Sequence, residues 1–310
     1  VEWTIPLPGS YQSGYTSFDD LTQFNFDTCG NKIFQLYVED INECKDSIPG
    51  NVDVWCEPTA NFNAGPVCFN NTTIFQDLSL PSDSITNWHW DFDDGNISHL
   101  QDPTHQYLTC GDFYVTLIVE DINGCNDTIT DTVVVWCLPE VEFKTDSVCE
   151  GNATTFTSTS LPGAPPSAQI TTWVWSFTTT NNDTVEYTYS SCGSFSETLT
   201  VTDANQCTDI STGAVVVYCN PTAGFDVNPA CFDHQPVVFN NASADGSAPI
   251  NYWEWTITGG NYNPPYTSFD TSTQYNFNNC GPQSFTLYVE DPNECKDSIP
   301  GNVDVWCEPT

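Results

Sequence analysis

The sequence predicts an all-β fold, built as a linear array of tandem β-sandwich modules that disulfides staple together. An internal repeat is the first observation behind this prediction: residues 38–59 return at 289–310 with a single substitution. The wider match joins Tyr15–Thr59 to Tyr266–Thr310 at a constant offset, which indicates recent duplication and a repeat architecture. The copy begins part-way through a unit and the chain contains no Met. We therefore expect it to be a segment of a longer tandem array.

A shorter period inside the repeat is marked by a tetrad of an aromatic residue, Cys, any residue and Pro. The tetrads lie at residues 55–58, 136–139, 218–221 and 306–309. Because Pro interrupts strand pairing and stiffens a connection, each tetrad is expected to close a module. The predicted modules are a partial one at residues 1–59 and full ones at 60–139, 140–221 and 222–310.

Short runs of β-formers, punctuated by Gly, Pro, Asn and Asp, are the third observation. Thr132–Trp136 is such a run before a tetrad, and Val141–Phe143 is the run that follows it. This spacing is typical of all-β sandwiches. Modules of about 80 residues bury only about 60% of their unfolded surface, so covalent staples help to stabilise them. No stretch approaches the roughly 20 apolar residues that span a bilayer.

The core of each module is predicted from strands with a period of two. Trp88, Trp90 and Phe92 share one face of a strand, and Phe113, Val115, Leu117 and Val119 line a strand that opposes it. Large apolar residues on one face indicate two sheets packed against each other. The corresponding residues of the later modules are Trp173, Trp175 and Phe177, and Trp253, Trp255 and Ile257.

The first module is predicted to be incomplete. Val1–Ile5 matches Trp253–Ile257, so the chain enters this module at its third strand. A half sandwich that exposes its apolar face is not expected to be stable alone. Either residues upstream in the native protein or a neighbouring subunit would supply the two missing strands, and we favour the first explanation.

The charge excludes one class of partner. Forty-one acidic residues against four Lys and no Arg give a formal net charge of −37. Nucleic-acid binding needs Lys or Arg at the phosphates, so nucleic acid is excluded as a partner. The acidic surface can be explained as a solvated face that keeps a large polymer soluble, or as oxygen-rich loops that bind calcium.

Four motifs between residues 85 and 125 resemble those of PKD (polycystic kidney disease) domains. They read ITNWHWDFDDG at 85–95, DPTHQY at 102–107, GDFYVTL at 111–117 and NGC at 123–125. The resemblance covers the chain as one partial and three full modules, of the kind found in repetitive Bacteroidota-type cell-surface proteins. It implies Ig-like, seven-stranded sandwiches that serve as spacers or adhesion modules of cell-surface proteins and secreted hydrolases. The aspartates of the first motif are absent from residues 176–180 and 256–260.

Fifteen Cys without any CxxC pair indicate an oxidising, extracellular setting. Each full module carries one Cys before its second strand, one before its sixth, one in its last hairpin and one after its last strand. In the Ig-like fold that the resemblance implies, the hairpin lies at the opposite pole from the other three. About ten strand residues separate the poles by roughly 33 Å, which no disulfide can span. We therefore expect the hairpin Cys to bond to the preceding module.

One disulfide assignment is preferred and one alternative stays open. The expected bonds are Cys68–Cys110, Cys149–Cys192 and Cys231–Cys280 within modules, and Cys56–Cys125, Cys137–Cys207 and Cys219–Cys295 between modules. Cys29, Cys44 and Cys307 are left unpaired, as cutting an array at both ends would leave them. The alternative joins Cys110 to Cys137 and uses Cys68 across the junction. It is disfavoured because an inward register of Phe113 with Val133 needs an even residue sum, and 110 plus 137 is odd. Either assignment places a bond across every junction.

The carboxylates of the first PKD-like motif are the candidate metal site. Asp91, Asp93, Asp94 and Asn96 could coordinate calcium, which takes six to eight oxygen ligands. The alternative is a solvent-facing hairpin that Asp94 and Gly95 turn. Paired carboxylates also serve glycosidases, but no cleft and no nucleophile motif accompanies them. We expect no enzyme activity and no cofactor other than calcium.

A glycosylation signal recurs along the chain. Asp-Ser/Thr-aliphatic resembles the O-glycosylation signal of Bacteroidota surface proteins, although such Ser and Thr also occur simply at exposed strand edges. The acceptors would be Ser47, Ser84, Thr128, Thr132, Ser147, Thr184 and Ser298.

The function expected from these observations is structural. The chain would be a repeat of an extracellular bacterial stalk, adhesin or filament, held as a rigid rod by disulfides between domains. Its partners would be neighbouring repeats of the same polymer, other copies and surface glycans, with no membrane span in this segment. The alternative is a set of carbohydrate-binding or spacer modules of a secreted hydrolase, in which aromatic residues of PKD domains can contact polysaccharide.

Overall fold

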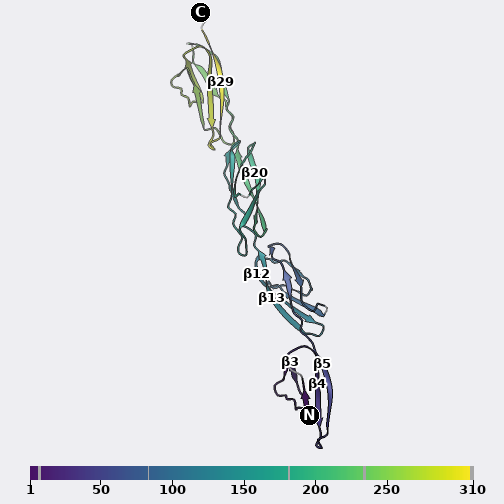
Figure 1. The fold of residues 1–310 in the computed structure, drawn as a ribbon. Coiled ribbons are helices and arrows are strands. Elements are labelled where there is room, and N and C mark those ends of the chain that lie inside the picture. Colours follow the sequence, from purple (N-terminus) through teal and green to yellow (C-terminus); the bar gives the residue numbers. More distant parts are fainter. Residues whose placement is uncertain (6–7, 83, 181, 233–234, 308–310) are drawn as a thin grey trace. The chain divides into compact units, whose positions relative to one another are not determined.

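The computed structural model describes residues 1–5, 8–82, 84–180, 182–232 and 235–307. Within this part of the chain every helix or strand assigned is a β-strand (Figure 1), so the predicted all-β class is confirmed. None of the described segments forms a helix long and apolar enough to cross a bilayer. The chain divides into two compact units, Val1–Cys137 with Ala164–Pro166 and Leu138–Gly163 with Ser167–Thr310. We call residues 1–59, 60–139, 140–221 and 222–310 modules 1 to 4.

Module 2, in the first unit, is a two-sheet sandwich. Its strands are β6 (Phe62–Ala64), β7 (Val67–Cys68), β8 (Thr73–Asp77), β9 (Ile85–Asp91), β10 (Ile97–Ser98), β11 (Thr104–His105), β12 (Gly111–Asp121) and β13 (Asn126–Trp136). One sheet has the order β10-β9-β12-β13-β7 and the other β11-β8-β6. Along β12 every second residue is buried, and Phe75 of the facing sheet packs on Trp90 at 5.4 Å between ring centroids. This alternation is the reason that one face of each sheet forms the core.

Modules 3 and 4, in the second unit, repeat this architecture. Module 3 contains β14 (Phe143–Thr145), β15 (Val148–Cys149), β16 (Ala153–Ser158), β17 (Ile170–Trp175), β18 (Thr178–Thr180), β19 (Thr184–Thr188), β20 (Gly193–Asp203) and β21 (Thr208–Tyr218). Module 4 contains β22 (Phe225–Val227), β23 (Ala230–Cys231), β24 (Val237–Asn241), β25 (Tyr252–Ile257), β26 (Gly260–Tyr262), β27 (Ser272–Phe277), β28 (Gly281–Glu290) and β29 (Lys296–Trp306). Their sheets run β14-β16-β19 with β15-β21-β20-β17-β18, and β22-β24-β27-β26 with β23-β29-β28-β25.

Each sandwich is centred on one tryptophan, as the sequence predicts. Trp90, Trp175 and Trp255 are fully buried, and each lies two residues after a half-buried tryptophan on the same face of its strand. Phe113, Val115, Leu117 and Val119 are all buried in module 2. The predicted core face is therefore confirmed, and these aromatics are committed to packing within the module.

Module 1 forms a smaller set of strands. They are β1 (Glu2–Thr4), β2 (Gly9–Tyr11), β3 (Phe24–Phe26), β4 (Gly30–Glu39) and β5 (Lys45–Val54), in sheets β1-β4-β5 and β2-β3. Trp3 pairs with Leu36 in the same register in which Trp255 pairs with Leu287. Module 1 thus begins at the equivalent of β25, as the sequence match predicts.

Candidate functional site at the module junctions

Every module carries the same internal disulfide, between the start of one long strand and the end of the next. The bonds are Cys29–Cys56, Cys110–Cys137, Cys192–Cys219 and Cys280–Cys307, each with a sequence separation of 27. In module 2 the ladder between β12 and β13 ends at Gly111 paired with Val135. Cys110 and Cys137 lie just beyond that last pair, with their Cα atoms 5.0 Å apart.

The rule that paired residues have an even sum argues against this bond, but the rule applies only to residues paired within the β12–β13 ladder. Phe113 does pair with Val133, as the inward register requires, but the two cysteines are outside the paired residues. Gly111 has a φ of 150°, a backbone conformation that L side chains rarely adopt. This glycine turns the chain so that Cys110 reaches the end of the neighbouring strand. A glycine with positive φ follows the equivalent Cys in each of the other modules.

The preferred assignment within modules is therefore wrong. Cys110, Cys192 and Cys280 bond to the last cysteine of their own module, so the bonds Cys68–Cys110, Cys149–Cys192 and Cys231–Cys280 do not form. Cys29 and Cys307 were expected to be unpaired, but each closes the bond of its own module. The alternative that joins Cys110 to Cys137 is the correct one.

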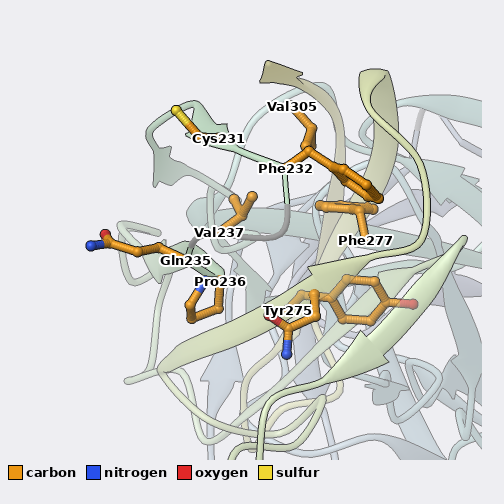
Figure 2. Close-up of a pocket in the computed structure, with 9 residues that line it drawn as sticks. Cys231, Phe232, Gln235, Pro236, Val237, Tyr275, Phe277 and Val305 are labelled. Carbon is orange, nitrogen blue, oxygen red and sulfur yellow. The ribbon is translucent and has the colours of Figure 1, made fainter. Parts of the chain in front are cut away.

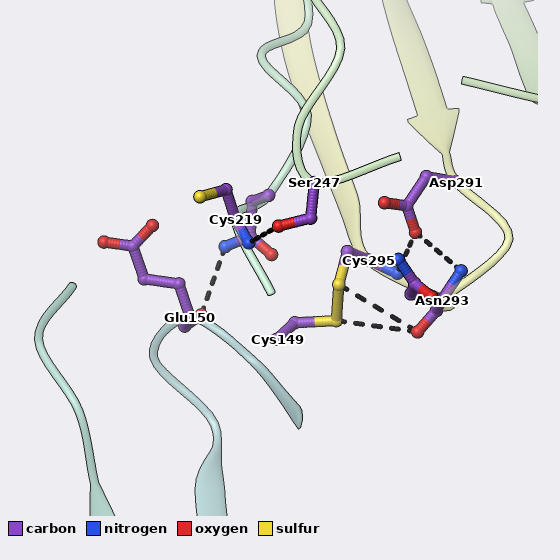
Figure 3. The surroundings of a disulfide bond; sticks show 8 residues. Cys149, Glu150, Cys219, Ser247, Asp291, Asn293 and Cys295 are labelled. Atoms are coloured by element: carbon purple, nitrogen blue, oxygen red, sulfur yellow. Dashed lines mark hydrogen bonds between the residues drawn. A yellow bond between two sulfur atoms is a disulfide. The ribbon is translucent and has the colours of Figure 1, made fainter. Parts of the chain in front are cut away.

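A disulfide of the second unit crosses from module 3 to module 4. Cys149, at the end of β15, bonds to Cys295 in the hairpin between β28 and β29, with a Cα–Cα distance of 5.5 Å (Figure 3). The short strand β15 runs parallel to the end of β21, with Cys149 opposite Tyr218. This places Cys149 at the pole of module 3 that meets module 4. The Sγ atoms of both cysteines lie within 4 Å of the Asn293 carbonyl oxygen.

The expectation that a hairpin cysteine bonds to the preceding module is confirmed for Cys295, but its partner is corrected. Cys219 is already bonded to Cys192, so the bond Cys219–Cys295 does not form. The bonds Cys56–Cys125 and Cys137–Cys207 do not form for the same reason, because Cys56 and Cys137 are already bonded within their own modules. The junction bond is formed instead by the cysteine that precedes the second strand of its module, which is Cys149 in module 3.

The hairpin that presents Cys295 is shaped by one carboxylate. Asp291 Oδ1 accepts hydrogen bonds from the backbone amides of Asn293, at 2.9 Å, and Cys295, at 3.0 Å (Figure 3). Glu294 between them has a φ of 64°, the left-handed conformation that closes the turn. The Asp291 side chain is buried, and a buried carboxylate needs such donors.

This hairpin motif, Asp-x-Asn-x-Cys, occurs once in each module. The aspartates are Asp40, Asp121, Asp203 and Asp291, and each one accepts hydrogen bonds from the amides two and four residues later. The hydrogen bond from the Cys44 amide lowers the pKa of Asp40. Burial opposes ionisation of Asp121, but the amides of Cys125 and Asn123 lower its pKa overall. The sequence interpretation missed this motif, although its fourfold recurrence at fixed spacing was a readable signal.

Hydrogen bonds reinforce the junction between modules 3 and 4. Asn220 Nδ2 donates to the Glu150 carbonyl oxygen at 3.1 Å, and the Cys219 amide donates to Ser247 Oγ at 2.6 Å (Figure 3). In the linker, the Ala223 amide donates to Asp297 Oδ2 at 2.9 Å. The linker is therefore fixed to both modules, in addition to the disulfide.

The remaining cysteines differ in state. Cys68 and Cys207 are disulfide-bonded, whereas Cys44, Cys125 and Cys231 are free thiols. Cys44 was expected to be free, but Cys125 and Cys231 were not. Cys44 and Cys231 are exposed, and Cys125 is partly covered. Cys231 lies at the rim of a cavity of about 170 Å³ whose walls include Phe232, Pro236 and Phe277 (Figure 2).

The carboxylates of the candidate calcium site make separate hydrogen bonds. Within the described part of the chain no three His, Cys, Asp or Glu side chains converge as a metal-binding group. Asp91 accepts a hydrogen bond from the Asp93 amide, and Asp93 accepts one from the Tyr114 amide. Asp94 contacts His105 Nε2 at 2.7 Å and accepts hydrogen bonds from the Asn96 amide and side chain. Each carboxylate thus has its own hydrogen-bond partner, as in the hydrogen-bonded turn that is the alternative to calcium, and calcium binding by these residues stays a prediction.

Five of the seven candidate glycosylation residues lie in strands, and Ser84 and Ser147 lie just before strands. Six of the seven are exposed, and Ser84 is half-buried, with its hydroxyl donating to the Pro81 carbonyl oxygen at 3.1 Å. Glycosylation at these residues stays a prediction.

Known proteins share sequence similarity with this chain. A family model described as PKD domain matches residues 55–135 and 136–217. Microbial collagenase of Vibrio alginolyticus is 33% identical over 103 residues, which is 33% of this chain and 12% of the collagenase. The chain thus spans only a small part of that relative's length.

Two solved PKD structures are also similar. The PKD1 domain of Vibrio anguillarum Epp is 28% identical, with a TM-score of 0.24, and covers 26% of this chain and 94% of its own. The PKD1 domain of the Vibrio cholerae metalloprotease PrtV is 33% identical, with a TM-score of 0.23, and covers 26% of this chain and 98% of its own. The segments that the family model matches make up more than half of the residues, and the chain belongs to the PKD domain family.

Proposed function

We propose that this chain is a structural repeat of an extracellular bacterial stalk, adhesin or filament, in which disulfides between modules stiffen the junctions. A single observation carries the proposal: Cys149–Cys295 joins two sandwiches that are otherwise connected by a short linker. Two tethers at one junction restrict hinge motion far more than a linker alone. The acidic, Lys-poor surface would keep such a polymer soluble.

Orientation between modules 3 and 4 tests the stiffening directly. Donor and acceptor dyes would be attached at the exposed residues Thr184 and Asn302 through unnatural amino acids. The double substitution Cys149→Ser/Cys295→Ser should broaden the distribution of energy-transfer efficiencies. The matched control is Cys280→Ser/Cys307→Ser, which removes the equivalent bond inside module 4 and should leave the width unchanged. Equal widths in all three proteins would contradict the stiffening role.

The second candidate function is a spacer or carbohydrate-binding segment of a secreted hydrolase. The similarity to a microbial collagenase over 103 residues favours it. Co-sedimentation of the chain with insoluble polysaccharide and with insoluble collagen would separate the two proposals. Retention by either polymer would favour the appendage, and its absence together with stiff junctions would favour the stalk. Neighbouring repeats, other copies and surface glycans are the partners we propose for the stalk.

A further inference from the structure

Two histidines of module 2 lie against each other on the outer face of its larger sheet. Along β9, Trp88 and Trp90 face the core, so His89 between them faces outward. β10 pairs with β9 in a register that sets Ser98 opposite Trp90, and the next residue, His99, therefore lies beside His89. The two imidazole rings are 5.1 Å apart between centroids, with their planes at 41°. The hairpin brings them together although ten residues separate them in the sequence, so sequence spacing alone gives no sign of a site.

A hydrogen bond to the backbone fixes the protonation of one ring. His99 Nδ1 lies 3.1 Å from the Trp88 carbonyl oxygen. Because a carbonyl oxygen can only accept, Nδ1 of His99 carries the proton, and Nε2 of the neutral ring presents its lone pair. Histidines that bind metals are usually held in this way, with one ring nitrogen donating to an oxygen and the other on the metal. His99 thus has one nitrogen free to bind a cation.

The ring of His89 faces a hollow and is not engaged by a hydrogen bond. Its two nitrogens have no hydrogen-bond partner among the described residues. The side chain is half-buried and forms part of the wall of a hollow of about 420 Å³, together with Asn87, His99 and Glu120. In the neutral ring one of the two nitrogens offers a lone pair. A cation in the hollow can therefore meet two imidazoles at once.

The separation of the two rings fits a single metal ion. Zinc binds an imidazole nitrogen at about 2.0–2.1 Å, which places the centre of the ring about 3.2 Å from the metal. Two such rings at the tetrahedral angle have their centres about 5.2 Å apart. The rings of His89 and His99 are 5.1 Å apart. They have to turn about their side-chain bonds to share an ion, but they need not move apart or closer together.

A carboxylate of the neighbouring strand can supply a third ligand. Ile118 and Glu120 of β12 pair with His89 and Asn87 of β9. The exposed Glu120 is therefore the diagonal neighbour of His89 on the same face, a position from which a long side chain can reach it. The three side chains do not converge in the part of the chain that the structure describes. The Glu120 carboxylate has to rotate towards the imidazoles to complete the set, and water can take the fourth position.

We propose that His89, His99 and Glu120 bind a zinc ion on the outer face of module 2. Imidazoles with one carboxylate suit Zn²⁺, whereas Ca²⁺ takes oxygen ligands alone. The net charge of −37 raises the concentration of divalent cations near the chain. The ion ties the end of the two-residue strand β10 to the longer strands β9 and β12. This site goes beyond the proposed function, because it does not depend on the junction disulfide.

Titration of the full chain with Zn²⁺ tests the site. The chain carries Cys44→Ser, Cys125→Ser and Cys231→Ser, because free thiols also bind zinc. Isothermal titration calorimetry should show one equivalent of Zn²⁺ bound before the weaker sites on scattered carboxylates fill. An excess of Ca²⁺ should not displace this equivalent. Displacement by Ca²⁺, or the absence of a distinct first equivalent, would overturn the proposal.

Matched substitutions in the same background locate the ligands. His89→Gln and His99→Gln should each weaken zinc binding about tenfold or more, whereas His105→Gln, in the same module but in contact with a different carboxylate, should not. Glu120→Gln should also weaken the binding, whereas Asp112→Asn, at an exposed position of the same strand, should not. If His89→Gln and His99→Gln match His105→Gln, zinc is held by carboxylates alone and the proposal fails. If Glu120→Gln matches Asp112→Asn, the assignment of the third ligand is wrong.

Nuclear magnetic resonance reads the metal ligands directly. The chain contains four histidines, so labelling them with ¹⁵N gives four sets of imidazole signals. Zn²⁺ should shift the signal of Nε2 of His99 and that of one ring nitrogen of His89, while Nδ1 of His99 stays protonated against the Trp88 carbonyl oxygen. The signals of His105 should keep their positions. Shifts confined to the other histidines, or no shift in any of the four, would contradict the site.

Discussion

The junction disulfide makes a mechanical prediction, because it provides a shorter path for force than the polypeptide. Consider a chain pulled between a handle at Glu140 and another at the C-terminus. Tension reaches Cys149, passes through the bond to Cys295 and continues to Cys307. The residues between Cys149 and Cys295 carry no load and cannot be extended.

Breaking that bond changes the path and therefore the extended length. In Cys149→Ser/Cys295→Ser, force runs along residues 149–192, crosses Cys192–Cys219, runs along 219–280 and crosses Cys280–Cys307. These segments replace residues 295–307 of the original path. The net gain is about 92 residues, or roughly 300–330 Å of contour length at about 3.3–3.6 Å per residue.

Single-molecule force spectroscopy under non-reducing conditions measures this length. The unsubstituted chain should extend by only the short segments outside the bond. The control Cys44→Ser/Cys231→Ser, which removes two free thiols, should match it. Equal contour lengths for the junction variant and the control would refute the assigned connectivity, and with it the role of the junction bond in carrying force.

Three further predictions concern single residues. Cys44, which is exposed, should react with a thiol reagent faster than Cys125, because burial and neighbouring carboxylates raise the pKa of the Cys125 thiol; peptide mapping after timed labelling measures this. Asp291→Ala should destabilise module 4 by about 1.5–3 kcal/mol, because two amides lose a charged acceptor, as denaturant unfolding would show. Burial opposes ionisation of Asp94, but His105 and Asn96 lower its pKa below 3.8. This contribution to stability is therefore present above pH 3.8 and is lost as the pH falls below it, and His105→Gln should reduce that pH dependence in thermal melts.

The fold could be predicted from sequence because its signals are local and repeated. Trp88 and Trp90 have the period of two, and the tetrads mark the ends of long strands. The two-residue strand β7, which holds Cys68 beside Trp136, gives no such signal. Its parallel pairing with the last strand of the module depends on the tertiary structure.

The disulfide connectivity could be predicted only in part. The distance between the poles correctly predicts that Cys295 bonds to the preceding module, whereas Cys125 is free. Three cysteines share the other pole, and strand periodicity cannot choose among them. The choice depends on where the ladder ends, since Cys110 escapes the register rule by lying one residue beyond Gly111. That boundary is a backbone property of a single glycine, and the sequence pattern shows the glycine but not its φ.

The hairpin that carries the junction cysteine is formed before it finds a partner. Asp40 holds the amides of Asn42 and Cys44 at 2.8 Å although Cys44 is free. Asp291 holds its hairpin in the same way with Cys295 bonded. The geometry of the turn is therefore set by the aspartate and does not depend on the disulfide. A preorganised thiol loses little conformational entropy when it bonds, so the aspartate-held turn lowers the entropic cost of the junction bond at Cys295.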